Sequence, residues 1–306
     1  MNTTPAVQVR DLHKHYGAKR AVDGLDLTVE AGEVFAVLGP NGAGKTTTIE
    51  ILEGYRDRDS GDVTVLGVDP RKADRAWRSR VGIVLQSADD QAELTVRELV
   101  RHVARFYPSP RDPDELVEAV GLTAKAGTRV RQLSGGQRRR LDVALGIVGR
   151  PELLFLDEPT TGFDPEARRS FWDLLRGLRD DGTTILLTTH YLDEAEQLAD
   201  RVAVVRDGRV VALDAPRALG GRATHEALVR WHEAGEVREV RTPTPTALVA
   251  DLVRRFAPGE VTALEVLRPT LEDVYLEMVG ERTSRASTAQ ATTDTPAPAD
   301  LEESVR

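Results

Sequence analysis

The sequence predicts an α/β fold built on a mixed β-sheet. Short apolar strands alternate with helical stretches from Val7 to about Leu213, which is typical of a sheet covered by helices. A glycine-rich segment follows the apolar run 33–38, and a pair of acids follows the apolar run 153–156. In open α/β sheets ligands bind beyond the carboxyl ends of the strands, so we expect both segments at one binding edge.

The glycine-rich segment fits the phosphate-binding loop pattern, so the predicted fold is that of a P-loop NTPase. It reads Gly39-Pro40-Asn41-Gly42-Ala43-Gly44-Lys45-Thr46, and Thr47 follows. The apolar run 33–38 predicts a buried strand before the loop, and Lys45–Leu52 predicts a helix whose positive end faces the phosphates. We expect Lys45 to reach the β- and γ-phosphates of ATP and the Thr46 hydroxyl to hold Mg²⁺.

The two acids that follow the run 153–156 are candidates for the hydrolytic chemistry. Asp157 is placed to reach Mg²⁺, directly or through water, and Glu158 to polarise the attacking water. A single acid at a strand end often only caps the next helix. We interpret the pair as functional because the same chain carries a phosphate-binding loop.

A helical insertion into the α/β core is predicted from about residue 91 to 148. Its periodicity indicates helices over Thr95–Phe106, Pro113–Val120 and Ser134–Val148. Within the third, we expect the triplet Arg138-Arg139-Arg140 to form a solvated helix face.

The chain changes character after residue 220, where the large domain (5–220) is predicted to give way to a small α+β accessory domain (221–280). Its expected elements are a strand at Glu236–Arg241, a helix at Thr246–Phe256, a strand at Val261–Leu267 and a helix at Thr270–Val279. Residues 281–306 are too poor in large apolar side chains to build a core, so we expect a disordered tail.

The composition excludes several classes of protein. A net charge of −9 argues against a broad nucleic-acid-binding face. The chain has no cysteine, which excludes disulfides and thiolate metal sites. No apolar run approaches the roughly 18 residues of a membrane-spanning helix, so we expect a protein that is soluble or attached to a membrane through a partner.

The segment Leu133-Ser134-Gly135-Gly136-Gln137 separates this chain from most other phosphate-loop ATPases. With the phosphate loop and the acid pair, it makes residues 5 to 220 resemble the nucleotide-binding subunit of an ABC transporter. Ser134 stands at a predicted helix start, and Gly135 and Gly136 leave backbone amides open to a phosphate. In that family the phosphate belongs to ATP on the opposing subunit, so the resemblance implies two copies that close head to tail around two nucleotides.

The remaining motifs of that family occur in the same order along the chain. The resemblance implies that Tyr16 stacks on adenine and that Gln86 contacts Mg²⁺ and relays the nucleotide state to the helical insertion. It also implies that Asp164 is in the loop that crosses the dimer interface, where Phe163 replaces the more usual Leu. For His190 it implies a contact with the γ-phosphate and a part in holding the attacking water. The full set implies a competent ATPase that uses ATP and Mg²⁺.

Each motif occurs once, so the resemblance implies that the chain pairs with a second ATP-binding subunit. We expect that subunit to be a second copy of the same chain. The pair would drive a separate integral membrane permease. Arg268–Glu277 resembles the ending of bacterial daunorubicin-resistance-type exporters, which move drugs, lipids or polysaccharides outward. The resemblance further implies a peripheral position on the cytoplasmic face of a bacterial membrane, no nucleic-acid partner and no direct contact with the transported substrate. Two alternatives stay open: an ABC importer ATPase, and a soluble ABC ATPase that acts without a permease.

Overall fold

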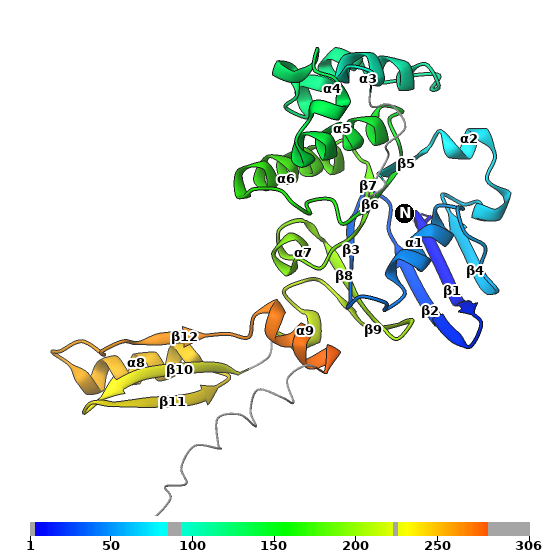
Figure 1. Ribbon diagram of the computed structural model, residues 1–306. Helices are drawn as coiled ribbons and strands as arrows, with labels where there is room; N and C mark the ends of the chain where they lie inside the picture. Colours follow the sequence, from blue (N-terminus) through cyan, green and yellow to red (C-terminus); the bar gives the residue numbers. More distant parts are fainter. Residues whose placement is uncertain (1–3, 85–92, 223–225, 281–306) are drawn as a thin grey trace, which may run out of the picture.

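The computed structural model describes residues 4–84, 93–222 and 226–280, which contain three β-sheets (Figure 1). A six-stranded sheet forms the centre, one three-stranded sheet lies beside it, and another belongs to the C-terminal part of the chain. The mixed-sheet α/β fold predicted from the sequence is confirmed. Among the described residues, no helix combines the length and the apolar character needed to cross a membrane.

The central sheet places the predicted functional segments at one edge. Its strands, in spatial order, are β5 (Val81–Val84), β6 (Leu153–Asp157), β7 (Thr184–Thr188), β3 (Val34–Leu38), β8 (Arg201–Arg206) and β9 (Arg209–Asp214). The first five are parallel, and β9 runs antiparallel to β8. Strands β3, β6 and β7 are buried on both faces, which explains their continuous apolar sequences. The chain leaves all three at their carboxyl ends, on the same side of the sheet.

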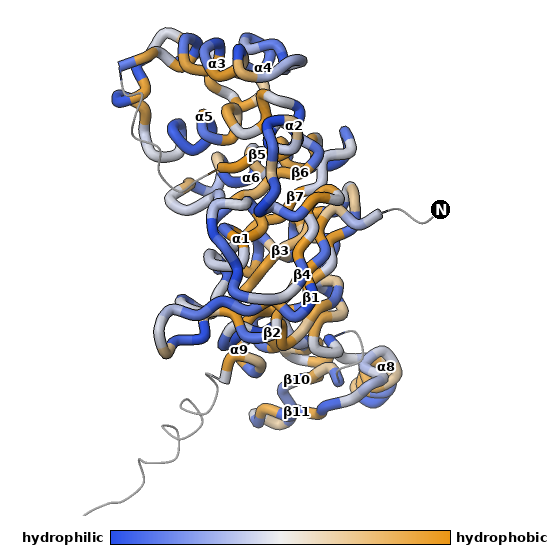
Figure 2. The backbone as a smooth tube through the Cα atoms, turned by 90° about the vertical axis from the view of Figure 1, so that its right-hand side faces the viewer, coloured by the Kyte–Doolittle hydropathy of each residue, from blue (hydrophilic) through white to orange (hydrophobic). Residues whose placement is uncertain are grey.

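Both faces of the central sheet are covered. On one face, residues of α6 (Pro165–Asp180), α7 (Leu192–Leu198) and the helical insertion join the sheet in a hydrophobic cluster. On the other face, α1 (Lys45–Leu52), the short helix α2 (Arg75–Arg78) and the second sheet form a separate cluster. Figure 2 shows the hydrophobic segments concentrated around β3 and its neighbouring strands.

The second sheet is antiparallel, with the order β2 (Lys19–Val29), β1 (Val7–Tyr16) and β4 (Ser60–Val65). Alternate residues of β1 and β2 are buried against α1 and against Phe35 and Val37 of β3. The opposite face of this sheet carries polar side chains. The loop that joins β3 to α1 lies against β2, where Gly44 approaches the backbone of Ala21.

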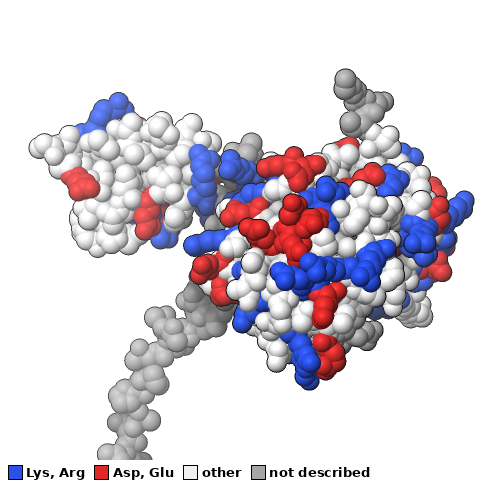
Figure 3. Space-filling view, turned by 90° about the horizontal axis from the view of Figure 1, so that it is seen from above, with Lys and Arg blue, Asp and Glu red and all other residues white. Residues whose placement is uncertain are grey.

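The helical insertion consists of α3 (Val96–Ala104), α4 (Pro113–Ala119) and α5 (Gly135–Ile147), so the three predicted helices are confirmed with shorter ends. Arg97 and Arg101 of α3 pair with Asp114 of α4 at 2.9 and 2.7 Å. Seen from above, charges of both signs are interspersed on the molecular surface (Figure 3).

The C-terminal part contains β10 (Ala227–Glu233), β11 (Glu236–Thr242), α8 (Pro245–Phe256) and β12 (Glu265–Leu267). Strand β10 lies between β11 and β12 in the sheet and was not predicted from the sequence. Strand β12 was predicted to begin at Val261 but begins at Glu265. Trp231 of β10 and Leu252 of α8 belong to the small core of this part.

The last described helix, α9 (Leu271–Val279), packs away from this small core. Leu271 belongs to the main hydrophobic cluster, and α9 contacts α7 (Figure 1). The described elements from β10 to β12 thus share one small core, while α9 packs on the main one. An accessory domain over residues 221–280 stays a prediction. The tail predicted for residues 281–306 lies outside the described residues.

Candidate active site

The predicted phosphate-binding loop connects β3 to α1, and its glycines are sterically required. The backbone φ of Gly44 is 104°, which residues with a side chain rarely adopt. A Cβ atom at Gly44 would lie 2.3 Å from the carbonyl oxygen of Ala21 on β2. A Cβ atom at Gly39 would lie 2.3 Å from the carbonyl oxygen of Val205 on β8. Only glycine fits at these two points of the loop.

Lys45 begins α1, and the loop holds its ammonium group. Its Nζ donates to the carbonyl oxygen of Gly39 at 2.7 Å and to that of Pro40 at 3.2 Å. Burial lowers the pKa of Lys45, while the nearby carboxylates of Glu158 and Asp157 oppose that shift. Gly44 offers no side chain to cap α1, so the N–H groups of the first turn remain oriented for an anion.

The acid pair lies at the end of β6 and is tied to β7. Asp157 Oδ1 accepts a hydrogen bond from the Thr188 hydroxyl. The backbone N–H of Glu158 donates to the carbonyl oxygen of Thr188 at 3.1 Å. Glu158 has a positive φ of 45°, a conformation that is uncommon outside glycine and concentrates at functional sites. The two carboxylates are therefore fixed relative to the neighbouring strand.

Arg139 of α5 holds the segment after β6 from the other side. Its side chain is buried, donates to the carbonyl oxygen of Asp157, and donates through Nε to that of Pro159 at 3.2 Å. The prediction that the Arg138-Arg139-Arg140 triplet forms a solvated helix face is wrong at Arg139. Its side chain is buried because the carbonyl groups after β6 require a hydrogen-bond donor. The signal that could have found it is the spacing to Val143 and Ile147, which lie one and two turns later on the buried face.

His190 follows β7 and contacts Glu158. The imidazole Nδ1 lies 3.2 Å from Glu158 Oε1, and both side chains remain partly exposed. The ring of His190 also packs on that of Tyr191, with centroids 4.1 Å apart. Two residues that were predicted from separate motifs are thus brought together by adjacent parallel strands.

One cavity of about 440 Å³ brings the acid pair together with Tyr16 and most of the phosphate-binding loop. Its lining consists of Tyr16, Lys19, Ala21, Asn41, Gly42, Gly44, Lys45, Thr46, Thr47, Asp157 and Glu158. Lysines and a helix N-terminus face two carboxylates across it, which suits a polyphosphate together with a divalent cation. Tyr16 is 42% exposed, as a surface for stacking requires. Sequence reasoning missed Lys19, a cation on the same strand as Ala21.

Gly39, Pro40 and Ala43 do not line this cavity. Gly39 and Pro40 supply the carbonyl groups that hold Lys45, and Ala43 is buried. Gln86 lies outside the described residues. Gly39, Pro40 and Ala43 thus shape the loop from behind the cavity wall.

The Ser134–Gln137 segment begins α5 and contributes nothing to the lining of this cavity. The N–H of Gln137 donates to Ser134 Oγ at 3.3 Å, and the N–H of Ser134 donates to Gln137 Oε1 at 3.1 Å. This reciprocal cap fixes the helix start, while Ser134 and Gly135 stay exposed.

Asp164 caps α6 by accepting a backbone N–H at 2.7 Å. Phe163 beside it is buried edge-on against Phe171, with ring centroids 5.6 Å apart. A Cβ atom at Gly136 would lie 3.8 Å from the ring of Phe163. The larger Phe at this position is therefore accommodated between α6 and the start of α5.

The comparisons with known proteins agree on one family. Residues 22–161 match the family model described as ABC transporter. The chain is 40% identical to the daunorubicin/doxorubicin resistance ATP-binding protein DrrA of Streptomyces peucetius, over 95% of this chain and 98% of that protein. It is 39% identical to the Nod factor export ATP-binding protein I of Rhizobium johnstonii, over 90% of this chain and 95% of that protein.

The solved structure of an ATP binding subunit of an ABC transporter has the same fold. It aligns with a TM-score of 0.67 and 23% identity, over 90% of this chain and 99% of that chain. At this identity the likeness concerns the fold alone. The aligned residues make up 90% of this chain, so they extend beyond the central sheet into its C-terminal part.

Proposed function

The chain belongs to the ABC transporter family, and we propose that it is the ATP-binding and ATP-hydrolysing subunit of an exporter. One relative is named for drug resistance and another for Nod factor export, and both align along nearly their whole length. These names favour outward transport over import. The Arg268–Glu277 ending, which includes most of α9, supports the same assignment.

The contact between Glu158 and His190 is the observation that carries the proposed hydrolysis. Glu158 acts as the general base that takes a proton from the attacking water. His190, 3.2 Å away, orients Glu158 and donates toward the γ-phosphate. Lys45 leaves the carbonyl groups of Gly39 and Pro40 to bind the β- and γ-phosphates. Tyr16 provides the stacking surface for adenine.

The oxygen donors at the cavity fit Mg²⁺, a hard cation that prefers oxygen ligands. We assign the Thr46 hydroxyl and the Asp157 carboxylate, which both line the cavity, to it. The family resemblance adds Gln86 as a further ligand. When bound, Mg²⁺ neutralises charge on the β- and γ-phosphates. The tie between Asp157 and Thr188 orients the carboxylate for this role.

A second ATP-binding subunit completes each site in this proposal, with a homodimer as the simplest arrangement. The exposed start of α5 at Ser134 and Gly135 does not line the chain's own cavity, so it is free to meet a nucleotide on the facing copy. The Asp164 loop lies at the same interface. Head-to-tail closure then brings the two halves of each site together.

The transport path belongs to a separate integral membrane permease in this proposal. We place the subunit on the cytoplasmic face of the membrane as a peripheral protein, where it touches neither the transported substrate nor nucleic acid. Gln86 and the helical insertion form the docking region for the permease.

The test is transport by inverted membrane vesicles that contain the full chain and the membrane protein that co-purifies with it. ATP-dependent accumulation of candidate compounds inside these vesicles is expected for the wild type and for Glu166→Gln, an exposed control on α6. Glu158→Gln is expected to abolish it. Recovery of no integral membrane protein would favour a soluble ATPase, and ATP-driven loss of compound from the vesicles would favour an importer.

A further inference from the structure

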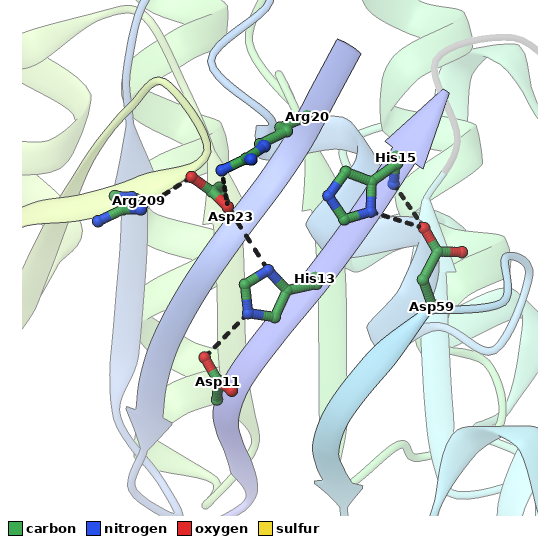
Figure 4. Close-up of polar contacts among 7 residues, drawn as sticks. All are labelled: Asp11, His13, His15, Arg20, Asp23, Asp59 and Arg209. Atoms are coloured by element: carbon green, nitrogen blue, oxygen red, sulfur yellow. Dashed lines mark hydrogen bonds and ion pairs between the residues drawn. The ribbon is translucent and has the colours of Figure 1, made fainter. Parts of the chain in front are cut away.

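Two histidines and an aspartate meet on the polar face of the second sheet, outside the proposed catalytic cavity (Figure 4). His13 and His15 are two residues apart on β1, so their side chains lie on the same face. Asp23 is the residue of β2 that pairs with His13 in the strand register. One ligand atom from each of the three lies within 4.8 Å of the other two.

We propose that His13, His15 and Asp23 form a binding site for a divalent transition-metal ion, with Zn²⁺ as the representative ligand. Two imidazoles and one carboxylate are a donor set that first-row transition metals accept, whereas Mg²⁺ and Ca²⁺ prefer oxygen. The ion would therefore be chemically distinct from the Mg²⁺ proposed for the nucleotide site. Water completes its coordination, because this face of the sheet is open to solvent.

The orientation of the imidazoles supports this assignment. His13 places Nδ1 3.5 Å from Asp23 Oδ1 and Nε2 2.9 Å from Asp11 Oδ1. His15 places Nδ1 3.2 Å from Asp59 Oδ2, which leaves its Nε2 for a metal. A carboxylate that accepts the proton-bearing nitrogen keeps the other nitrogen deprotonated, and metal-bound histidines commonly have such a partner. Asp11 and Asp59 therefore serve as supporting acceptors.

The supporting acceptor Asp59 is itself fixed. The Lys14 ammonium lies 2.9 Å from Asp59 Oδ1, and the backbone N–H of His15 donates to Oδ2 at 2.6 Å. These two contacts hold the Asp59 carboxylate in place as an acceptor for the His15 imidazole.

The third ligand, Asp23, is held by two arginines. Arg209 contacts Oδ2 at 2.8 Å, and Arg20 contacts Oδ1 at 3.5 Å. Because Arg209 contacts Oδ2, the Oδ1 atom of Asp23 faces the histidines (Figure 4). A metal ion bound to Oδ1 would therefore displace only Arg20, whose contact with Oδ1 is the longer of the two. Ligand atoms about 2.0–2.1 Å from Zn²⁺ lie roughly 3.4 Å apart in a tetrahedron, so the side chains must close in by rotation. Both arginines oppose a cation, and this limits the affinity.

The test is equilibrium dialysis of the nucleotide-free full chain against Zn²⁺, at a pH where histidine is neutral. One equivalent is expected to bind to the wild type. The double variant His13→Gln, His15→Gln is expected to lose at least ~10-fold in affinity, and Asp11→Asn about 10-fold through the loss of a supporting acceptor. His232→Gln, which changes an exposed histidine on β10, is the matched control and should bind as the wild type does.

Circular dichroism and the melting temperature establish that each variant is folded, so that a loss of binding reports on the site. Zn²⁺ binding that is unchanged in the double variant, or an absence of binding to the wild type, overturns the proposal. The measurement contains no nucleotide, so its outcome is independent of the proposed ATPase function. If Zn²⁺ binding were lost in Glu158→Gln and kept in the histidine double variant, the ion would lie at Glu158 and His190. That result would also contradict the assignment of the site to His13, His15 and Asp23.

Discussion

His190 Nδ1 lies 3.2 Å from Glu158 Oε1, and the two residues follow the adjacent parallel strands β7 and β6. The same register ties Thr188 to both acids, since its hydroxyl donates to Asp157 and its carbonyl oxygen accepts from the Glu158 N–H. The positions of Glu158, the proposed base, and of His190 are thus set by sheet pairing, and the proposed chemistry depends on this pairing.

Replacing His190 with Ala is expected to lower kcat for ATP hydrolysis about 100-fold or more, because Glu158 loses the group that orients it. ATP affinity should change little, since the phosphate loop is intact. Steady-state phosphate release and nucleotide titration measure the two quantities. His232→Ala is the control, and normal turnover by His190→Ala would refute the role given to this histidine.

Replacing Arg139 with Met is expected to destabilise the chain by roughly 2 to 4 kcal/mol, because one buried and one partly buried carbonyl group lose their donor. The hydrolysis rate should fall as well, since Arg139 holds the backbone of Asp157. Urea unfolding measures the first effect. Arg169→Met, at an exposed position on α6, should be nearly neutral. Equal stability of the two variants would show that Arg139 is not structural.

Replacing Gly44 with Ala is expected to abolish ATP binding and to cost roughly 2 to 3 kcal/mol of stability. The new Cβ meets the carbonyl oxygen of Ala21, and φ is 104°. Gly127→Ala is a matched control, because its Cβ would meet no atom within 4 Å and its φ is not in the left-handed region. Retained nucleotide binding by Gly44→Ala would contradict the geometry of the loop.

Glu53 gives a prediction for pH dependence. Burial, with the charges of Asp157 and Glu50, raises its pKa from 4.5 to about 8. The folded state therefore favours the protonated acid, so its stabilising contribution is complete below pH 4.5 and is lost as the pH rises toward 8. Glu53→Gln should remove that loss, worth on the order of 2 to 4 kcal/mol.

The measurement is urea unfolding of the nucleotide-free chain at pH 5, 6.5 and 8, with Glu118→Gln as an exposed control. The wild type and the control should lose more stability across this range than Glu53→Gln does. Parallel curves for all three proteins would show that Glu53 is not protonated in the folded state.

The sequence predicted those parts of the fold and site that depend on local chemistry. The helix Lys45–Leu52 was predicted with its observed bounds, because Gly44 marks its start and the apolar run of β3 precedes it. The contact between Glu158 and His190 needed more than local reasoning. Each motif predicted one residue, but only the pairing of β6 with β7 brings them together.

The parts that were missed depend on tertiary packing. Arg139 belongs to a basic triplet, and only the position of α5 against the segment after β6 decides which arginine is buried. Strand β10 was missed although its residues alternate, with Val229 and Trp231 inward. The amphipathic sequence of α9 predicts a helix but cannot specify which core it joins, and it joins the main one through Leu271.

The central claim is that ATP is held between two copies of this chain. The most direct test is the molar mass of purified Glu158→Gln, measured by light scattering during gel filtration with and without ATP and Mg²⁺. We predict a dimer with nucleotide and a monomer without it, and loss of the dimer when Ser134→Arg is added to block the facing site. A monomer that nevertheless retains bound ATP would contradict the account.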